Sequence, residues 1–80
     1  MATRKVMLKY PENQIQSPLL FEMAKRFDVM PNIRRARVTE TVGEIALELV
    51  GDPENLASGI RFLEEAGVLV EPLEGDVVSP

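Results

Sequence analysis

Two pairs of carboxylates are the first side chains in this sequence that could do chemistry. Glu64 and Glu65 are adjacent, and Glu12 with Asp28 gives a second candidate pair. Paired carboxylates suit acid–base catalysis or metal binding. Adjacent residues on a helix project about 100° apart, so Glu64 and Glu65 cannot converge on one proton or ion. A solvated helix face is the better interpretation, and we expect no metal site.

A catalytic nucleophile has equally little support. Ser17 has no histidine to activate it, because the sequence contains neither His nor Cys, and no Gly-x-Ser-x-Gly turn surrounds it. The dipeptide Ser17-Pro18 has instead the pattern of a helix start, with Ser as the N-cap and Pro at the first helical position. The lack of thiolates also excludes disulfides, cysteine-bound iron–sulfur clusters and Cys-type zinc sites. We expect neither an enzyme nor a cofactor.

Three arginines, Arg34, Arg35 and Arg37, form a basic cluster. On a strand, a spacing of two places Arg35 and Arg37 on the same side. A sheet that recognises nucleic acid needs aromatic residues for base stacking, and the outward positions nearby carry none. Two interpretations stay open: cross-strand pairing with Glu48, and recognition of a carboxylate or another anion at a subunit boundary.

Asn32 is the remaining polar side chain with a potential for binding. It follows Pro31 at the entrance of an expected edge strand, where backbone groups are unpaired, and its amide offers both a donor and an acceptor. It could hold the amino and carboxylate groups of a ligand, with Met30 or Ile33 in contact with the ligand side chain. A turn-forming asparagine is the alternative.

Hydrophobic periodicity and Pro or Gly stops divide the chain into the elements that must position these residues. The predicted order is strand, helix, strand, strand, helix, strand, over residues of about 4–10, 17–27, 33–40, 44–50, 53–66 and 68–70. Asp52 and Pro53 have the types that start a helix, and Gly67 the type that ends one. This β-α-β-β-α-β order is that of the ferredoxin-like split βαβ fold, in the α+β class.

The predicted fold has four antiparallel strands, with the first and third in the centre and both helices on one face. We expect its core to contain Leu20, Met23, Phe27, Leu47, Leu49, Ile60 and Leu63. Strict alternation would turn Ala36 and Val38 toward this core, and Ile33, Arg35 and Arg37 toward the open face. That face would mix apolar and charged groups, which favours a partner surface.

Length and charge limit the remaining choices. Eighty residues allow one domain with a modest core, so we expect a homodimer, with the domain over residues 1–73 and a flexible tail over 74–80. The net charge of −4 disfavours nucleic acid and anionic membranes as partners. No segment reaches the roughly 20 apolar residues needed to span a bilayer, and no secretory signal is evident, so we expect a cytoplasmic location.

The sequence resembles the NIL domain family over residues 5–73. The segments that carry the resemblance are specific in combination: Lys9-Tyr10-Pro11, Ser17-Pro18-Leu19-Leu20, Phe27-Asp28-Val29, Asn32-Ile33, Val42-Gly43-Glu44, Leu49-Val50-Gly51-Asp52, and Leu63 through Gly67-Val68. The signature triplet of the family is Asn-Ile-Leu, and Arg34 stands here at the Leu position. The residues that follow look more like the ferredoxin-associated branch of the family than the transporter branch.

The resemblance implies an ACT-like ferredoxin fold that homodimerises and, at the C-terminus of methionine-importer ATPase subunits, binds methionine near the dimer interface to inhibit uptake. Asn32 and Ile33 match the motif of that region, so they are ligand-binding and interface candidates, and Arg35 and Arg37 are further interface candidates. The charged Arg34 could favour a more acidic ligand.

Two functions therefore follow as hypotheses. One is a regulatory module that binds an amino acid such as methionine; the other is a ligand-free dimerisation or interaction module that acts with a ferredoxin-type or transporter partner. We expect the chain to be a stand-alone domain that signals to a separate protein.

Overall fold

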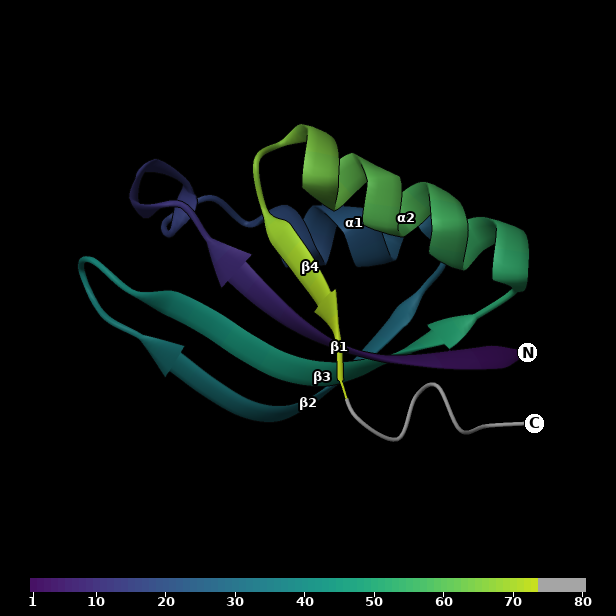
Figure 1. Cartoon of the computed structure of the whole chain (residues 1–80). Helices are drawn as coiled ribbons and strands as arrows, with labels where there is room; N and C mark the ends of the chain where they lie inside the picture. The colour runs from purple at the N-terminus through teal and green to yellow at the C-terminus, as the bar shows by residue number, and fades with distance from the viewer. Residues whose placement is uncertain (74–80) are drawn as a thin grey trace.

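The computed structural model describes residues 1–73 of the chain, with both helices on one face of a single sheet (Figure 1). The predicted tail, residues 74–80, lies outside the described residues. The elements are β1 (Ala2–Tyr10), a 3-10 helix (Glu12–Gln14), α1 (Leu19–Phe27), β2 (Met30–Val38), β3 (Gly43–Gly51), α2 (Pro53–Glu65) and β4 (Leu69–Pro72). Their order confirms the predicted β-α-β-β-α-β fold.

The sheet has the strand order β2-β3-β1-β4, and every neighbouring pair is antiparallel. β1 and β3 are therefore central and β2 and β4 lie at the edges, as predicted. The two central strands alternate buried with more exposed residues, which is the pattern of a sheet covered on one face. The face away from the helices is called the open face below.

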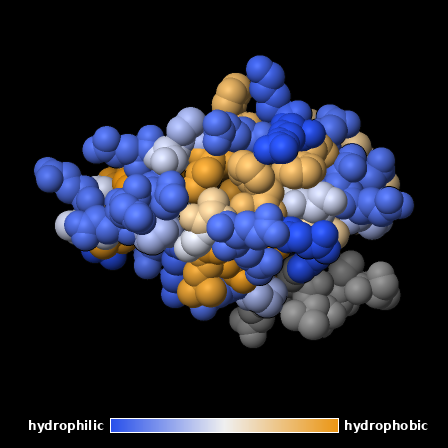
Figure 2. Space-filling model, turned by 90° about the horizontal axis from the view of Figure 1, so that it is seen from above, coloured by the Kyte–Doolittle hydropathy of each residue, from blue (hydrophilic) through white to orange (hydrophobic). Residues whose placement is uncertain are grey.

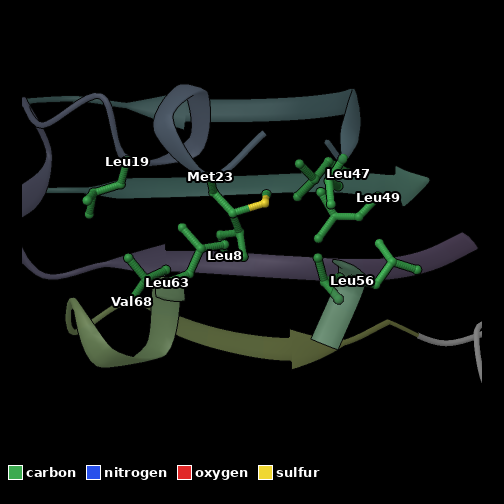
Figure 3. Close-up of a cluster of buried hydrophobic side chains, with 10 residues drawn as sticks. Leu8, Leu19, Met23, Leu47, Leu49, Leu56, Leu63 and Val68 are labelled. Carbon is green, nitrogen blue, oxygen red and sulfur yellow. The ribbon is translucent and has the colours of Figure 1, made fainter. Parts of the chain in front are cut away.

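The core lies between the sheet and the helices (Figure 3). It is made of Val6, Leu8, Leu19, Met23, Val29, Leu47, Leu49, Leu56, Leu63 and Val68. The prediction was right for Met23, Leu47, Leu49 and Leu63 and wrong for Leu20, Phe27 and Ile60, which are only half-buried and pack against the edge of this core. On α1, Leu19 lies in the core where Leu20 was expected, and on α2 Leu56 joins the predicted Leu63.

The two helices approach closely at Gly59 of α2. A Cβ atom at this position would lie 2.7 Å from the sulfur of Met23 and 3.7 Å from the Cβ of Phe27, both on α1. Carbon and sulfur cannot approach to 2.7 Å without a shift of one of them, so the absence of a side chain allows Met23 to fill the space between α1, α2 and the sheet.

The start of α1 differs from the prediction. The N-cap is Pro18 and not Ser17, and no side chain caps the helix. The backbone N–H of Ser17 donates to the carbonyl of Gln14, because the chain first forms the 3-10 turn that the sequence did not reveal. The predicted start of α2 is confirmed, since Asp52 is its N-cap and Pro53 its first residue. Gly67 follows the C-cap with φ of 98°, a conformation that glycine adopts easily.

β2 is longer at its start than predicted and is irregular. It begins at Met30, and Pro31 is accommodated because a residue without a backbone N–H is tolerated on an edge strand. Its register shifts between Ile33 and Arg35, so Arg34 is the extra residue of a β-bulge. Ala36 and Val38 lie on the helix side, as predicted, opposite Ile45 and Gly43, but both are exposed, because β2 extends beyond the area that the helices cover.

Candidate functional site

The open face is built from rows of residues paired across the sheet. One row joins Asn32, Glu48 and Lys5, and the next joins Arg35, Ala46 and Met7. Glu48 lies between the fully buried Leu47 and Leu49, so its side chain points to the opposite face. The same alternation places Asn32 on the open face with Glu48.

The bulge changes the faces that strict alternation predicted. Ile33 pairs with the core residue Leu47 and Arg35 pairs with Ala46, so these two residues point to opposite faces although they are two apart. The predicted position of Arg35 and Arg37 on the open face is confirmed by their partners, Ala46 and Glu44. The predicted position of Ile33 there is wrong: it lies on the helix side, with 55% of its surface exposed.

Arg34 also reaches the open face, which the sequence did not indicate. Its guanidinium donates a hydrogen bond to the carboxylate of Glu48 and forms an ion pair with it. This hydrogen bond, helped by the positive charges of Arg34 and Lys5 and opposed by desolvation, lowers the pKa of Glu48. Glu48 therefore pairs with Arg34, and not with Arg35 or Arg37 as one interpretation proposed.

Arg35 and Arg37 border a shallow depression of about 300 Å³ on the open face. Its other lining residues are Met7, Ala36, Glu44 and Ala46. Among residues 1–73, neither guanidinium forms an ion pair within 4 Å, although Arg37 and Glu44 are cross-strand neighbours. Two planar cations beside the apolar Met7 and Ala46 could bind a carboxylate with a short apolar group.

Asn32 and Ile33, the two ligand candidates, are neighbours in sequence on different faces. Asn32 is exposed, and its side-chain amide makes no hydrogen bond within the part of the chain that the structure describes. Met30, which is 60% exposed, shares its face and pairs with Val50. The apolar neighbour of Asn32 on the open face is therefore Met30 and not Ile33.

The open face also includes residues of β4 that the predicted fourth strand did not contain. Glu71 pairs with Met7 in the sheet, and its carboxylate lies 3.2 Å from the ammonium nitrogen of Lys9. β4 was predicted to end at Val70, so Glu71 had no place in the predicted sheet. Within residues 1–73, no three carboxylates are grouped to hold a metal ion, and no helix is long and apolar enough to cross a membrane.

A four-stranded antiparallel sheet with two helices on one face defines a ferredoxin-like α+β domain. The fold is shared with a crystal structure of the C-terminal domain of an ABC transporter ATP-binding protein from Enterococcus faecalis. The TM-score is 0.80 at 21% identity, over 90% of this chain and 84% of that one. The NIL domain family model matches residues 4–72, and the chain belongs to that family. The resemblance read from the sequence motifs is thereby confirmed.

Curated relatives at 31–35% identity are methionine import ATP-binding proteins. The protein from Listeria innocua is 32% identical over 73 residues, which is 86% of this chain and 22% of the relative. The protein from Symbiobacterium thermophilum is 35% identical over 71 residues, or 84% of this chain and 21% of the relative. The chain thus spans about a fifth of the length of these relatives.

Proposed function

We propose that this NIL domain is a non-catalytic regulatory module that forms a homodimer and binds an amino acid, such as methionine, at the start of β2. The observation that carries the proposal is the exposed end of this strand. There the exposed amide of Asn32 and the apolar side chains of Met30 and Val50 lie on one face. An amide can bind a ligand's polar groups while the apolar pair contacts an aliphatic or thioether side chain.

Arg34 does not make this region strongly basic, because its positive charge is paired with the carboxylate of Glu48. Besides this ion pair the Asn32 row holds Lys5, so the charges beside Asn32 are of both signs, as a zwitterionic amino acid requires. This supports a ligand with a neutral side chain over the acidic ligand that an unpaired arginine would favour. The names of the curated relatives, methionine import ATP-binding proteins, support the same choice.

The proposed dimer uses the exposed edge of β2. In the described residues this strand pairs only with β3. The exposed side chains of Met30, Ile33 and Val38 lie on its two faces, beside the unpaired edge. Unpaired strand edges with apolar side chains favour association with another chain. A second copy would also bring Asn32, Ile33, Arg35 and Arg37 to an interface, where the ligand region becomes more enclosed.

A ligand-free interaction module, acting with a ferredoxin-type or transporter partner, is the second candidate. The observation in its favour is that the depression on the open face is shallow and is not lined by Asn32. In one chain, a ligand at Asn32 would therefore stay largely in contact with water. The two candidates differ in whether an amino acid binds to the dimer.

Calorimetric titration separates them. Methionine and glutamate are titrated into the wild type, into Asn32→Ala, and into Asn13→Ala, which makes the same chemical change on the distant 3-10 helix. We expect methionine to bind the wild type and the control equally, and Asn32→Ala to lose about 1–3 kcal/mol of affinity because ligand polar groups stay unpaired. Equal affinity in all three proteins would place the site elsewhere, and no heat with either amino acid would favour the ligand-free module. Sedimentation equilibrium that gives the mass of one chain at micromolar concentration would contradict the dimer.

A further inference from the structure

The outer surface of the helices carries a group of aromatic and cationic residues, of which Phe62 also packs against the core. Figure 2 shows this side of the molecule, with apolar side chains exposed among charged ones. Phe21, Glu22, Lys25, Arg26 and Phe62 line a depression of about 660 Å³ there. We call these five residues the helix surface.

A cation lies beside each aromatic ring of the helix surface. The ammonium nitrogen of Lys25 lies 5.8 Å from the centre of the Phe21 ring, and the guanidinium carbon of Arg26 lies 5.6 Å from that of Phe62. Phe62 also packs against Phe27, with ring centres 5.7 Å apart. The cations are thus held beside the rings, and both line the depression.

Phe21 has no structural role that explains its position. It is 66% exposed, while its neighbours on α1, Leu19 and Met23, fill the core. A large aromatic group in water is unfavourable to leave uncovered, and aromatic residues flanked by cations are typical of the centres of protein interfaces. The exposed ring is therefore a candidate anchor point for another molecule.

We propose that the helix surface docks an acidic segment of a partner protein, with an aliphatic side chain on Phe21 and carboxylates on Lys25 and Arg26. The chain as a whole has a net charge of −4, whereas this surface has two cations and one carboxylate. Charge therefore favours an acidic segment both here and at the arginine cluster of the open face, and of these two places the helix surface is the one that adds the exposed ring of Phe21 for an aliphatic side chain.

Two other occupants fit the surface less well. A second copy bound by two-fold symmetry would bring the four cations and two carboxylates of two helix surfaces together, an excess of positive charge. A nucleic acid needs a row of phosphate contacts, and two cations on an acidic chain do not supply one. An acidic protein segment needs only these two cations and Phe21.

The test is an NMR titration of the ¹⁵N-labelled protein with a capped synthetic peptide of the sequence Glu-Asp-Leu-Leu-Glu-Asp. A second peptide, in which Lys replaces each acidic residue, is the charge control. We expect the acidic peptide to shift amide signals around residues 21–26 and 62, with a dissociation constant of about 1 mM or below, and the basic peptide to shift none of them. The shifts should weaken as salt is raised.

Variants at exposed positions make the test specific. Phe21→Ser and Lys25→Gln should each weaken binding of the acidic peptide by about two- to fivefold, as expected for single exposed contacts. Lys9→Gln removes the same charge from the open face and should leave the affinity unchanged. Equal loss in Lys25→Gln and Lys9→Gln would overturn the proposal, because only net charge would then matter. The absence of shifts, or shifts with both peptides, would also overturn the proposal. Signals of the helix surface that change with protein concentration alone would overturn it too, because they would reveal a second copy as the occupant.

Discussion

The close approach of the helices at Gly59 predicts an unusual response to Gly59→Ala. In an exposed helix this change stabilises a protein by about 0.5–1 kcal/mol, because alanine restricts the unfolded chain. Here the new Cβ would lie 2.7 Å from the sulfur of Met23, which is fully buried and cannot move into solvent. Overpacking of this kind costs about 1–3 kcal/mol, so we expect a net loss of about 0.5–2 kcal/mol in the free energy of unfolding.

The sign should reverse when Met23 is shortened. Met23→Ala alone should cost about 2–5 kcal/mol because it leaves a cavity. In that background the Cβ of Gly59→Ala has room, so the second change should stabilise the protein by about 0.5–1 kcal/mol. Urea unfolding of the four proteins measures this coupling, with Ser58→Ala as a control on the same helix that adds no clash. A stabilising Gly59→Ala in the wild-type background, or an equal effect in both backgrounds, would refute the steric argument.

Two further predictions concern the sheet. Leu47→Ala should lower the free energy of unfolding by about 2–5 kcal/mol, since Leu47 is fully buried on a central strand; a loss below about 0.5 kcal/mol in urea unfolding would contradict its place in the core. An NMR titration should find the pKa of Glu48 below its ordinary value of 4.5 in the wild type and near that value in Arg34→Gln. A carboxylate with a lowered pKa stabilises the fold above its unfolded pKa, so the stability that Glu48 adds should disappear as pH falls through the folded pKa. This stability should be smaller in Arg34→Gln, where Lys5 remains beside Glu48.

The order of the elements could be predicted because each one has a strong local signal. In α1 and α2 the apolar residues recur at helical spacing, and in β1 and β3 they alternate with polar ones. These spacings show which side chains face the core, and they can be read directly from the sequence. The ends of an element could not be predicted where contacts with other elements determine them. Pro31 ends strands in general, but at the outer edge of β2 its missing N–H costs no sheet hydrogen bond.

The candidate site could be predicted only in part, for a reason visible at Arg34. Strict alternation predicts the face of each side chain only in a regular strand. The segment 34–37 contains no glycine or other residue that would indicate a bulge. The bulge moved Ile33 away from the face of Arg35 and Arg37 and brought Arg34 to Glu48. The family motif pointed to Asn32 and Ile33 at the entrance of this strand, whereas both lie within β2, on opposite faces.

Deletion of Arg34 tests whether the bulge serves the fold or the site. Without the extra residue, Ile33 would be followed directly by Arg35, and regular alternation would keep Asn32 and Arg35 on the open face and Ile33 on the helix side. The side chain of Arg34 is 64% exposed, so we expect the free energy of unfolding to change by less than about 1 kcal/mol.

Deletion of Ala36 is the matched control on the same strand. It would move Arg37 into the place opposite Ile45, on the helix side, and should shift the pairing of the hairpin or lower the stability more. Amide hydrogen exchange and urea unfolding report both outcomes. If deletion of Arg34 destabilised the protein as much as deletion of Ala36, the bulge would be required by the hairpin itself. A stable protein that no longer binds methionine would instead show that the bulge shapes the surface around Asn32, because bulges re-aim side chains beside functional sites.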